Sequence, residues 1–525
     1  MKPFFVLFTL AAGLSATAQT PASPAKIYGK LFHDVQMAPV FPDQKTFPDA
    51  VPKKAPADIV ADYQKTTSNP AIRFALDLFV SENFEVPKEP QINYIRQETD
   101  IVAHIKNCWG VLRREAEKPV EGSSLLPLPH PYIVPGGRWR ELDYSTAYFA
   151  MLGLKESGHA DMIENMVKNF AAEADSLGYI PAGNRSYLLG RPGPPYFALM
   201  IELLASVKGD NAYQTFLPQL EKEYAYWMEG AAACKPGQAA KRLVKLADGT
   251  LLNRYWDDNN TPRAEQYRND VETAQKAGNK PLLYQQLRSA AASGWEPSGR
   301  WRADEKNAAS TIALSVIPID LNCLLYKLEQ VIARAKQAQG QDSAAAAFHK
   351  KADRRAFAID KYCWNKAINF YTDYNFLSRK QLNRITPAGI YPFCVYETKL
   401  DYMSLLARRV ATVIKTKLLK NGGIQSSDRS TGLDRDAPYG VAPLQWMAVY
   451  GLDRCGQKEL AREIGQRWIK LSTDVFKRSG KLLDKYNVAD TGVETNKGEG
   501  ISNYGFSYTN GVLLQLLAIY GLPKG

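Results

Sequence analysis

The spacing of apolar residues constrains the fold of this chain more than any other feature. From about residue 56 onward, apolar residues recur three and four positions apart, as they do along one face of an α-helix. About a dozen segments follow this pattern, and several stop at a glycine, the residue that most often ends a helix. Strict two-residue alternation, the mark of a half-buried strand, is almost missing. We therefore predict an all-α protein, with its clearest helices at 100–116, 161–178, 196–209, 356–364 and 459–476.

The first residues resemble an export signal. Lys2 precedes a short apolar run, and Ala16-Thr17-Ala18 fits the small-residue pattern that a signal peptidase reads. The apolar run is too short to span a membrane, and no later segment reaches about 18 unbroken apolar residues. We expect a signal peptide over 1–18 and a periplasmic or secreted protein without membrane insertion. An extended N-terminal arm, rich in Pro, Ala and Lys, should follow over 19–55, and a single catalytic domain over 56–525.

Charge and metal-binding residue types exclude several classes of function. The net charge is +12, but Lys and Arg are spread along the chain in mixed runs such as 350–355, which is typical of solvated helix faces. We therefore expect no nucleic-acid partner. The six cysteines lack metal-like spacing, and we interpret them as buried free thiols, although one or two disulfides are a possible alternative. The five histidines form no HxH or HExxH pattern, so we expect no metal and no other cofactor.

Several loops between the predicted helices carry an unusual set of side chains. Each combines Trp or Tyr with Arg and a carboxylate beside Gly or Pro, and such loops should converge on a partly closed pocket because exposed aromatics are costly. Sugars offer apolar faces for stacking and hydroxyls for charged hydrogen-bonding groups, and cleavage of a glycosidic bond needs two carboxyl groups. The loops are 134–149, 178–195, 252–267, 293–301, 433–446 and 482–492.

Seven motifs in this chain resemble, in order, those of the trehalases, glycoside hydrolases that cleave α,α-trehalose with inversion. The resemblance covers roughly residues 95 to 520. It implies an (α/α)6 toroid with long functional loops at one end, and a monomer that acts on a small disaccharide. The motifs are SLLPLPHPYIVPGGRWRE (124–141), GYIPAGNRSYLLGRPGPP (178–195), TPRAEQYRNDVE (261–272), SGWEPSGRW (293–301), VIPIDLNCLLY (316–326), DAPYGVAPLQW (436–446) and GFSYTNGVLL (505–514).

The resemblance also assigns roles to individual residues. It places the general acid at Glu296, where the family usually has Asp, and the general base at Asp484, where the family usually has Glu. Glu499 matches the glutamate of the family's Gly-rich lid. The positions that would contact the sugar are Arg138, Trp139, Arg191, Arg263, Glu265 and Trp295.

The two catalytic substitutions act in opposite directions. Glu is longer than Asp by one methylene, roughly 1.5 Å of reach, so the acid gains what the base loses. An inverting site needs its carboxyls about 6.5–9.5 Å apart to admit water, and a paired exchange can keep that gap. A carboxyl between Trp295 and Trp301 should also be desolvated, which favours the protonated form that a general acid needs.

Other departures from the family pattern bear on the substrate. The Trp and Asp of the family's Tyr-Trp-Asp-Ser become Ser145 and Thr146, and an Asn becomes Ala182. In the QWDxPNGWAP motif, two tryptophans and an asparagine are replaced by Arg435, Val441 and Tyr439. Each lost hydrogen-bonding group costs about 1–3 kcal/mol in a polar sugar site. Trehalose is the first candidate substrate; another α-glucoside or modified disaccharide, or sugar binding without turnover, are the alternatives.

Each assignment also has a purely structural alternative. Asp484 could pair with Lys485, in which case Glu494 and Glu499 are the next candidates for the base. Arg138 and Arg140 could brace the PGG turn through Glu141, which we favour for Arg140 only. Asp257 and Asp258 resemble acids but could pair with Arg254 in a capped loop.

Overall fold

Helices dominate the structure, a computed structural model that describes residues 21–69, 73–87, 100–397, 400–492 and 506–522. The strands are two or three residues long and form only two- and three-stranded sheets within these ranges. The predicted all-α class is confirmed. None of the described helices is both long and apolar enough to cross a bilayer. The five clearest predicted segments correspond to α4 (Ile101–Leu112), α6 (Ala160–Leu177), α7 (Phe197–Lys208), α13 (Asp342–Cys363) and α17 (Lys458–Ser479).

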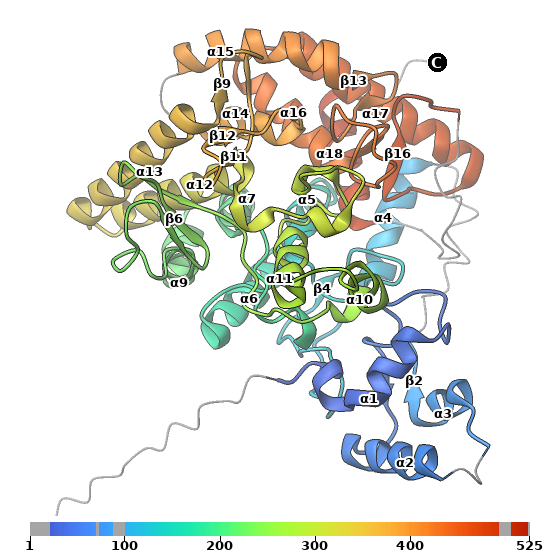
Figure 1. Ribbon diagram of the computed structural model, residues 1–525. Coiled ribbons are helices and arrows are strands. Elements are labelled where there is room, and N and C mark those ends of the chain that lie inside the picture. The colour runs from blue at the N-terminus through green and yellow to red at the C-terminus, as the bar shows by residue number, and fades with distance from the viewer. Residues whose placement is uncertain (1–20, 70–72, 88–99, 398–399, 493–505, 523–525) are drawn as a thin grey trace, which may run out of the picture.

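An inner ring of helices lies at the centre of the molecule (Figure 1). Among the described residues it consists of α5, α7, α12, α14, α16 and α18. Each helix packs against the next, and α18 packs against α5, which closes the ring. The inner helices are buried almost all round, as expected for helices with little polar surface. Besides α7, the helices of the inner ring are α5 (Tyr144–Glu156), α12 (Ile319–Ala338), α14 (Tyr391–Val395), α16 (Ala442–Arg454) and α18 (Ser507–Tyr520).

A second layer of helices surrounds the inner ring and alternates with it along the chain. α4 packs on α18, α6 on α5 and α7, α13 on α12, and α17 on α16 and α18. α9 (Leu217–Trp227) packs on α6 and α12, and α15 (Leu400–Val413) lies at the outer edge in Figure 1. α17 shows why these helices are outside, because its buried apolar stripe alternates with exposed Lys, Arg and Glu. The predicted (α/α)6 toroid is confirmed.

Two glycines let α5 and α18 approach closely. A Cβ added at Gly511 of α18 would lie 2.1 Å from the carbonyl oxygen of Phe149 on α5. A Cβ at Gly153 of α5 would lie 2.5 Å from the Cα of Gly511. Both distances are far below van der Waals contact, so only glycine permits this backbone packing. The close approach fixes the spacing of the two helices, which both carry residues that line the pocket described below.

The prediction of an extended segment over 19–55 is wrong. Residues Pro24–Met37 form the helix α1. Leu31, Phe32 and Val35 of α1 are buried in a small apolar cluster with Phe47, which also includes residues of α2 (Pro56–Ser68) and α3 (Leu76–Asn83). Most helical stability in proteins comes from such tertiary packing, and prolines and polar residues around α1 obscure its short apolar pattern. The boundary between arm and catalytic domain at residue 56 stays a prediction, and the signal peptide, 1–18, lies outside the described residues.

The cysteines are free and buried. All six, at 108, 234, 323, 363, 394 and 455, lie within the described residues and form no disulfide there. Burial raises the pKa of the Cys108 thiol to about 12, so this thiol stays protonated and unreactive at neutral pH. The interpretation of the cysteines as small core residues is confirmed.

Candidate active site

The loops that combine aromatic residues with Arg and carboxylates come together at one end of the helical ring. The loop before α5 joins the loop at 178–195, and the latter joins the loop at 252–267. The loop at 293–301 joins the loop at 433–438, and the start of α18 joins the PGG turn. The backbone hydrogen bonds that join them run from Tyr144 to Ala182 (3.1 Å), Asp258 to Gly190 (2.9 Å), Arg435 to Pro297 (3.1 Å) and Ser507 to Pro135 (2.7 Å).

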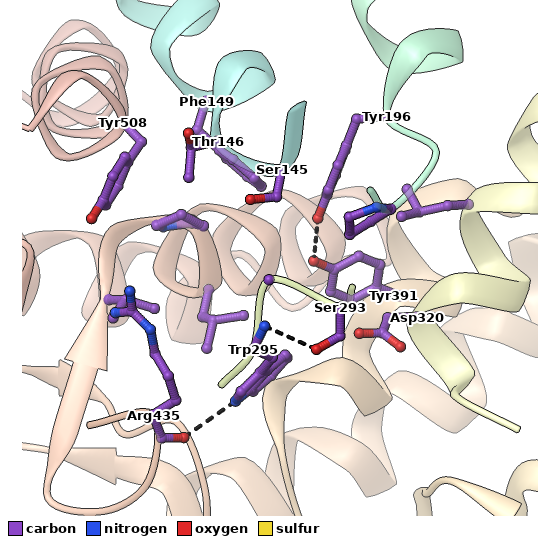
Figure 2. Close-up of a pocket in the computed structure, with 16 residues that line it drawn as sticks. Ser145, Thr146, Phe149, Tyr196, Ser293, Trp295, Asp320, Tyr391, Arg435 and Tyr508 are labelled. Carbon is purple, nitrogen blue, oxygen red and sulfur yellow. Dashed lines mark hydrogen bonds between the residues drawn. The ribbon is translucent and has the colours of Figure 1, made fainter. Parts of the chain in front are cut away.

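A pocket with about 610 Å³ of empty space opens among these loops (Figure 2). Trp295 and Arg435 lie on one side of it, and Ser145 and Thr146 from the first turn of α5 lie on the other. The inner helices contribute both apolar and polar walls. This mixed polar and apolar lining suits a small sugar. The further lining residues include Phe149, Tyr196, Ser293, Asp320, Leu324, Tyr391, Val441, Leu444 and Tyr508.

Asp484, the predicted base, lies directly before strand β16 (Lys485–Asn487). β16 pairs with β15 (Tyr439–Val441), and this pairing sets the position of Asp484 beside the pocket. Both terminal nitrogens of Arg435 donate to Oδ1 of Asp484, at 3.3 and 3.2 Å. The hydroxyl of Tyr508 donates to the same oxygen. Arg435 and Tyr508 line the pocket, so Asp484 lies immediately behind its wall; Lys485, the alternative partner, instead pairs with Asp434.

The loop that carries Trp295 and Glu296 is held from both sides. Asp436 accepts hydrogen bonds from the Ser298 hydroxyl and from the Gly299 backbone N–H, each at 2.7 Å. The Arg300 guanidinium lies 4.7 Å from the ring centroid of Trp295, and its two carboxylate partners, Asp320 and Asp373, hold it in place. The tryptophan ring is therefore a fixed wall of the pocket.

Glu296, the predicted acid, forms an ion pair with Arg263. Arg263 is buried and also pairs with Asp270 at 2.6 Å. The Glu296 side chain is 16% exposed, so the carboxyl keeps access to solvent. The structure thus places two predicted site residues, Arg263 and Glu296, in direct contact.

Arg191 and Glu265, two predicted sugar contacts, also bind each other. Nη1 of Arg191 lies 2.7 Å from Oε1 of Glu265, and Nε lies 3.2 Å from Asp257. Burial opposes the ionisation of Glu265, but the charges of Arg191 and Arg263 prevail and lower its pKa to about 2. Nη2 of Arg191 and Oε2 of Glu265 are buried and have no hydrogen-bond partner among the described residues. Unpaired buried groups of this kind can bind a ligand's hydroxyls.

Arg138 and Trp139 lie beside the N-terminal segment. Arg138 pairs with Asp43 at 3.2 Å, and the Lys45 ammonium lies 4.9 Å from the ring centroid of Trp139. Lys45 also pairs with Glu141 at 3.0 Å, and no direct ion pair joins Glu141 to Arg138 or Arg140 within the described residues. These contacts tie the N-terminal segment to the first motif, and they do not join Arg138 to either carboxyl.

Arg435 connects the loop that carries Glu296 to the side chain of Asp484. Its backbone carbonyl accepts a hydrogen bond from Nε1 of Trp295 at 3.2 Å, and its backbone N–H donates to Pro297, on either side of Glu296. Its side chain binds Asp484. Glu494 and Glu499 lie outside the described residues.

The structure adds residues that the motifs did not single out. Tyr196 and Tyr391 share a hydrogen bond of 2.6 Å in the pocket wall, and Asp320 and Tyr508 also line the pocket. Tyr508 and Asp320 belong to quoted motifs, so their polar groups within otherwise apolar runs were an available signal. Asp257 forms ion pairs with Arg191 and Arg288 instead of the expected Arg254. Its role is therefore structural, as the alternative stated, but with different arginines.

Four of the positions that depart from the family pattern line the pocket: Ser145, Thr146, Arg435 and Val441. The hydroxyls of Ser145 and Thr146 donate to Asp143, at 2.7 and 2.8 Å, so both are engaged at the start of α5. The departures therefore change the pocket surface itself.

A closed double ring of helices is typical of the (α/α)6 class of glycoside hydrolases, and here its pocket is lined by aromatic residues, Asp320 and Arg435, with the two candidate carboxyls on neighbouring loops. The family model "Trehalase" matches residues 39–521. The chain belongs to the trehalase family.

Individual relatives agree with this assignment. Periplasmic trehalase of Escherichia coli (strain K12) is 45% identical over 517 residues, which are 97% of this chain and 90% of the relative. The neutral trehalase structure from Saccharomyces cerevisiae superposes with a TM-score of 0.60 at 21% identity, over 94% of each chain. A GH63 mannosylglycerate hydrolase from Thermus thermophilus in complex with glucose matches 79% of this chain and 99% of its own, with a TM-score of 0.53 and 13% identity. The two structural matches show the shared fold.

Proposed function

We propose that this glycoside hydrolase cleaves α,α-trehalose into two glucoses, with inversion at the attacked carbon. The observation that carries the proposal is the link through Arg435, which connects the loop of Glu296 to Asp484 beside one pocket. Both positions keep a carboxyl although each differs from the family pattern. The relatives named periplasmic trehalase, which are 45% identical over nearly the whole chain, support the choice of sugar.

In the proposed reaction, Asp484 and Glu296 transfer protons at opposite sides of the bond. Asp484 takes a proton from a water molecule, whose oxygen attacks an anomeric carbon. The bond from that carbon to the bridging oxygen breaks, and Glu296 gives this oxygen a proton. One glucose leaves in the α form and the other is formed as β. Each carboxyl ends the cycle in the other's starting state, and proton exchange with solvent restores both.

Sugar binding in this proposal uses the buried polar groups and the aromatic wall. Nη2 of Arg191 and Oε2 of Glu265 are free to bind hydroxyls, which would satisfy both atoms. The indole of Trp295 offers a flat face to the apolar side of a glucose ring. Arg138, Trp139 and Glu499 stay in the proposal as further sugar contacts.

The compartment is proposed from the same comparison, and the assembly is a separate proposal. We propose a periplasmic protein, because the named relatives are periplasmic trehalases and residues 1–18 resemble a cleaved signal. One apolar core connects helices from α4 to α18, which supports a single catalytic domain, and we propose further that the protein acts as a monomer. Light scattering of the mature protein tests the monomer.

A substrate panel tests the proposal. The mature protein is incubated with trehalose, other α-linked glucose disaccharides and modified trehaloses, while glucose release and ligand binding are measured. Release from trehalose at the highest kcat/KM supports the proposal. Release only from another disaccharide identifies that sugar as the substrate, a change that the altered pocket residues Ser145, Thr146 and Arg435 would permit. Binding without release from any sugar contradicts hydrolysis.

A further inference from the structure

We infer that Arg435 and Tyr508 are positioning residues for Asp484, which hold one carboxylate oxygen in place and leave the other to take the proton from water. This inference rests on the proposed function, because it assumes that Asp484 is the base. It assigns a role to two residues that the family pattern does not predict.

The geometry separates the two oxygens of Asp484. Three donors converge on Oδ1: both terminal nitrogens of Arg435, at 3.3 and 3.2 Å, and the hydroxyl of Tyr508. No donor among the described residues contacts Oδ2. A carboxylate held by charged and neutral donors on one oxygen loses most of its rotational freedom, while the other oxygen stays available as a base.

Both donors are themselves fixed. Arg435 is anchored by its backbone, which binds Pro297 at 3.1 Å and Trp295 at 3.2 Å. Tyr508 is 5% exposed and lies in the first turn of α18, whose packing against α5 leaves no room for a Cβ at Gly511. The carboxylate is therefore held from two separate elements, and neither can move without disturbing the loops or the ring.

The two departures from the family pattern fit together in this arrangement. The pattern has a tryptophan where this chain has Arg435, and a longer Glu where it has Asp484. The indole N–H is a single neutral donor, whereas a guanidinium carries a charge and five N–H donors. Arg435 thus supplies directed contacts to a carboxylate that has lost about one methylene of reach.

The remaining charges near Asp484 do not replace these donors. Lys485 forms an ion pair with Asp434, and the Tyr486 hydroxyl accepts a hydrogen bond from the backbone of Leu483. Within the described part of the chain, Arg435 is therefore the cation that contacts Asp484 directly.

The test compares Arg435→Met and Tyr508→Phe with wild type on trehalose, or on the best sugar of the panel. We expect kcat to fall about 10–100-fold for Arg435→Met and about 3–10-fold for Tyr508→Phe, with KM within about threefold, because misplacement of the base affects the chemical step.

Matched controls remove similar contacts elsewhere. Arg429 lies near Arg435 in sequence and pairs with Glu305 and Asp428, so Arg429→Met removes a comparable guanidinium. Tyr371→Phe removes a hydroxyl that donates to Asp360 at 2.6 Å. Both controls should keep the wild-type kcat and KM. Thermal unfolding of all four variants separates loss of fold from loss of positioning.

Four outcomes would overturn the inference. If KM rises while kcat stays unchanged in folded Arg435→Met, Arg435 contacts the sugar instead. If Arg429→Met or Tyr371→Phe loses as much activity as its counterpart, the effect is structural. If wild type hydrolyses no sugar in the panel, both the proposed function and this inference are wrong. If wild type is active and the activity of Arg435→Met and Tyr508→Phe is unchanged, this inference alone is wrong.

Discussion

The hydroxyl of Tyr144 donates a hydrogen bond to Oε1 of Glu223 at 2.6 Å inside the helical ring. Oε2 of Glu223 is buried without a partner among the described residues. Burial raises the pKa of Glu223 from its usual 4.5 to about 8, although the Tyr144 hydrogen bond opposes this rise. The native protein therefore keeps a neutral carboxylic acid in its core at neutral pH.

Glu223 should make the protein less stable as the pH rises. Between pH 4.5 and about 8 the unfolded chain is ionised at this position while the native state holds the proton, so the native state binds more protons and stability falls with rising pH. Glu223→Gln removes this dependence. In urea unfolding, the free energy of unfolding of the variant should rise relative to that of wild type by up to about 1.4 kcal/mol per pH unit across that range. If the unfolding free energies of the two proteins change in parallel with pH, the prediction is wrong.

Glu265 should have the opposite pH dependence. Its pKa of about 2 lies below the usual 4.5, so it contributes stability above pH 4.5 that is lost as the pH falls toward 2. For a buried group this amounts to at most about 3 kcal/mol. Glu265→Gln should flatten the acid side of the stability profile and raise KM for the sugar. An unchanged KM with a flattened profile would make Glu265 purely structural.

The two candidate carboxyls can be tested by isosteric amides. Glu296→Gln and Asp484→Asn should each lower kcat at least about 10³-fold, since each removes a proton-transfer group, while calorimetry should still detect sugar binding. Glu305→Gln is the control, because Glu305 pairs with Arg384 on a neighbouring surface. Full activity in either catalytic variant would reassign that role.

The close approach of α5 and α18 predicts a large effect from a small side chain. Gly511→Ala places a Cβ 2.1 Å from the Phe149 carbonyl oxygen, so the two helices must separate, at a cost of about 1–3 kcal/mol or more. Gly110→Ala in α4 meets nothing within 4 Å and should stabilise the helix by up to about 1 kcal/mol. Calorimetry of both variants measures their unfolding temperatures relative to wild type. Similar changes in unfolding temperature for Gly511→Ala and Gly110→Ala would contradict the prediction.

Local pattern was sufficient for the helices of the ring but not for the N-terminal segment. α17 and α6 follow from three- and four-residue spacing, since one face of each is buried. α1 could not be predicted because Leu31 and Phe32 are buried by Phe47, whose position depends on the tertiary fold. The spacing of apolar residues carries no information on such a partner.

The site was predictable by type but not by pairing. Motifs placed Trp295 and Arg435 on candidate loops, and both line the pocket. The contact of Arg435 with Asp484 joins residues 49 positions apart, and only the pairing of β15 with β16 brings them together. Likewise, the ion pair of Arg263 with Glu296 depends on how two loops pack.

The most direct test of the account is the anomeric form of the glucose released from trehalose, followed by proton NMR within the first minutes of the reaction. Inversion by Asp484 and Glu296 predicts α- and β-glucose in equal amounts before mutarotation mixes them. Release of α-glucose alone would indicate retention and contradict the direct attack of water, and release of no glucose would contradict hydrolysis.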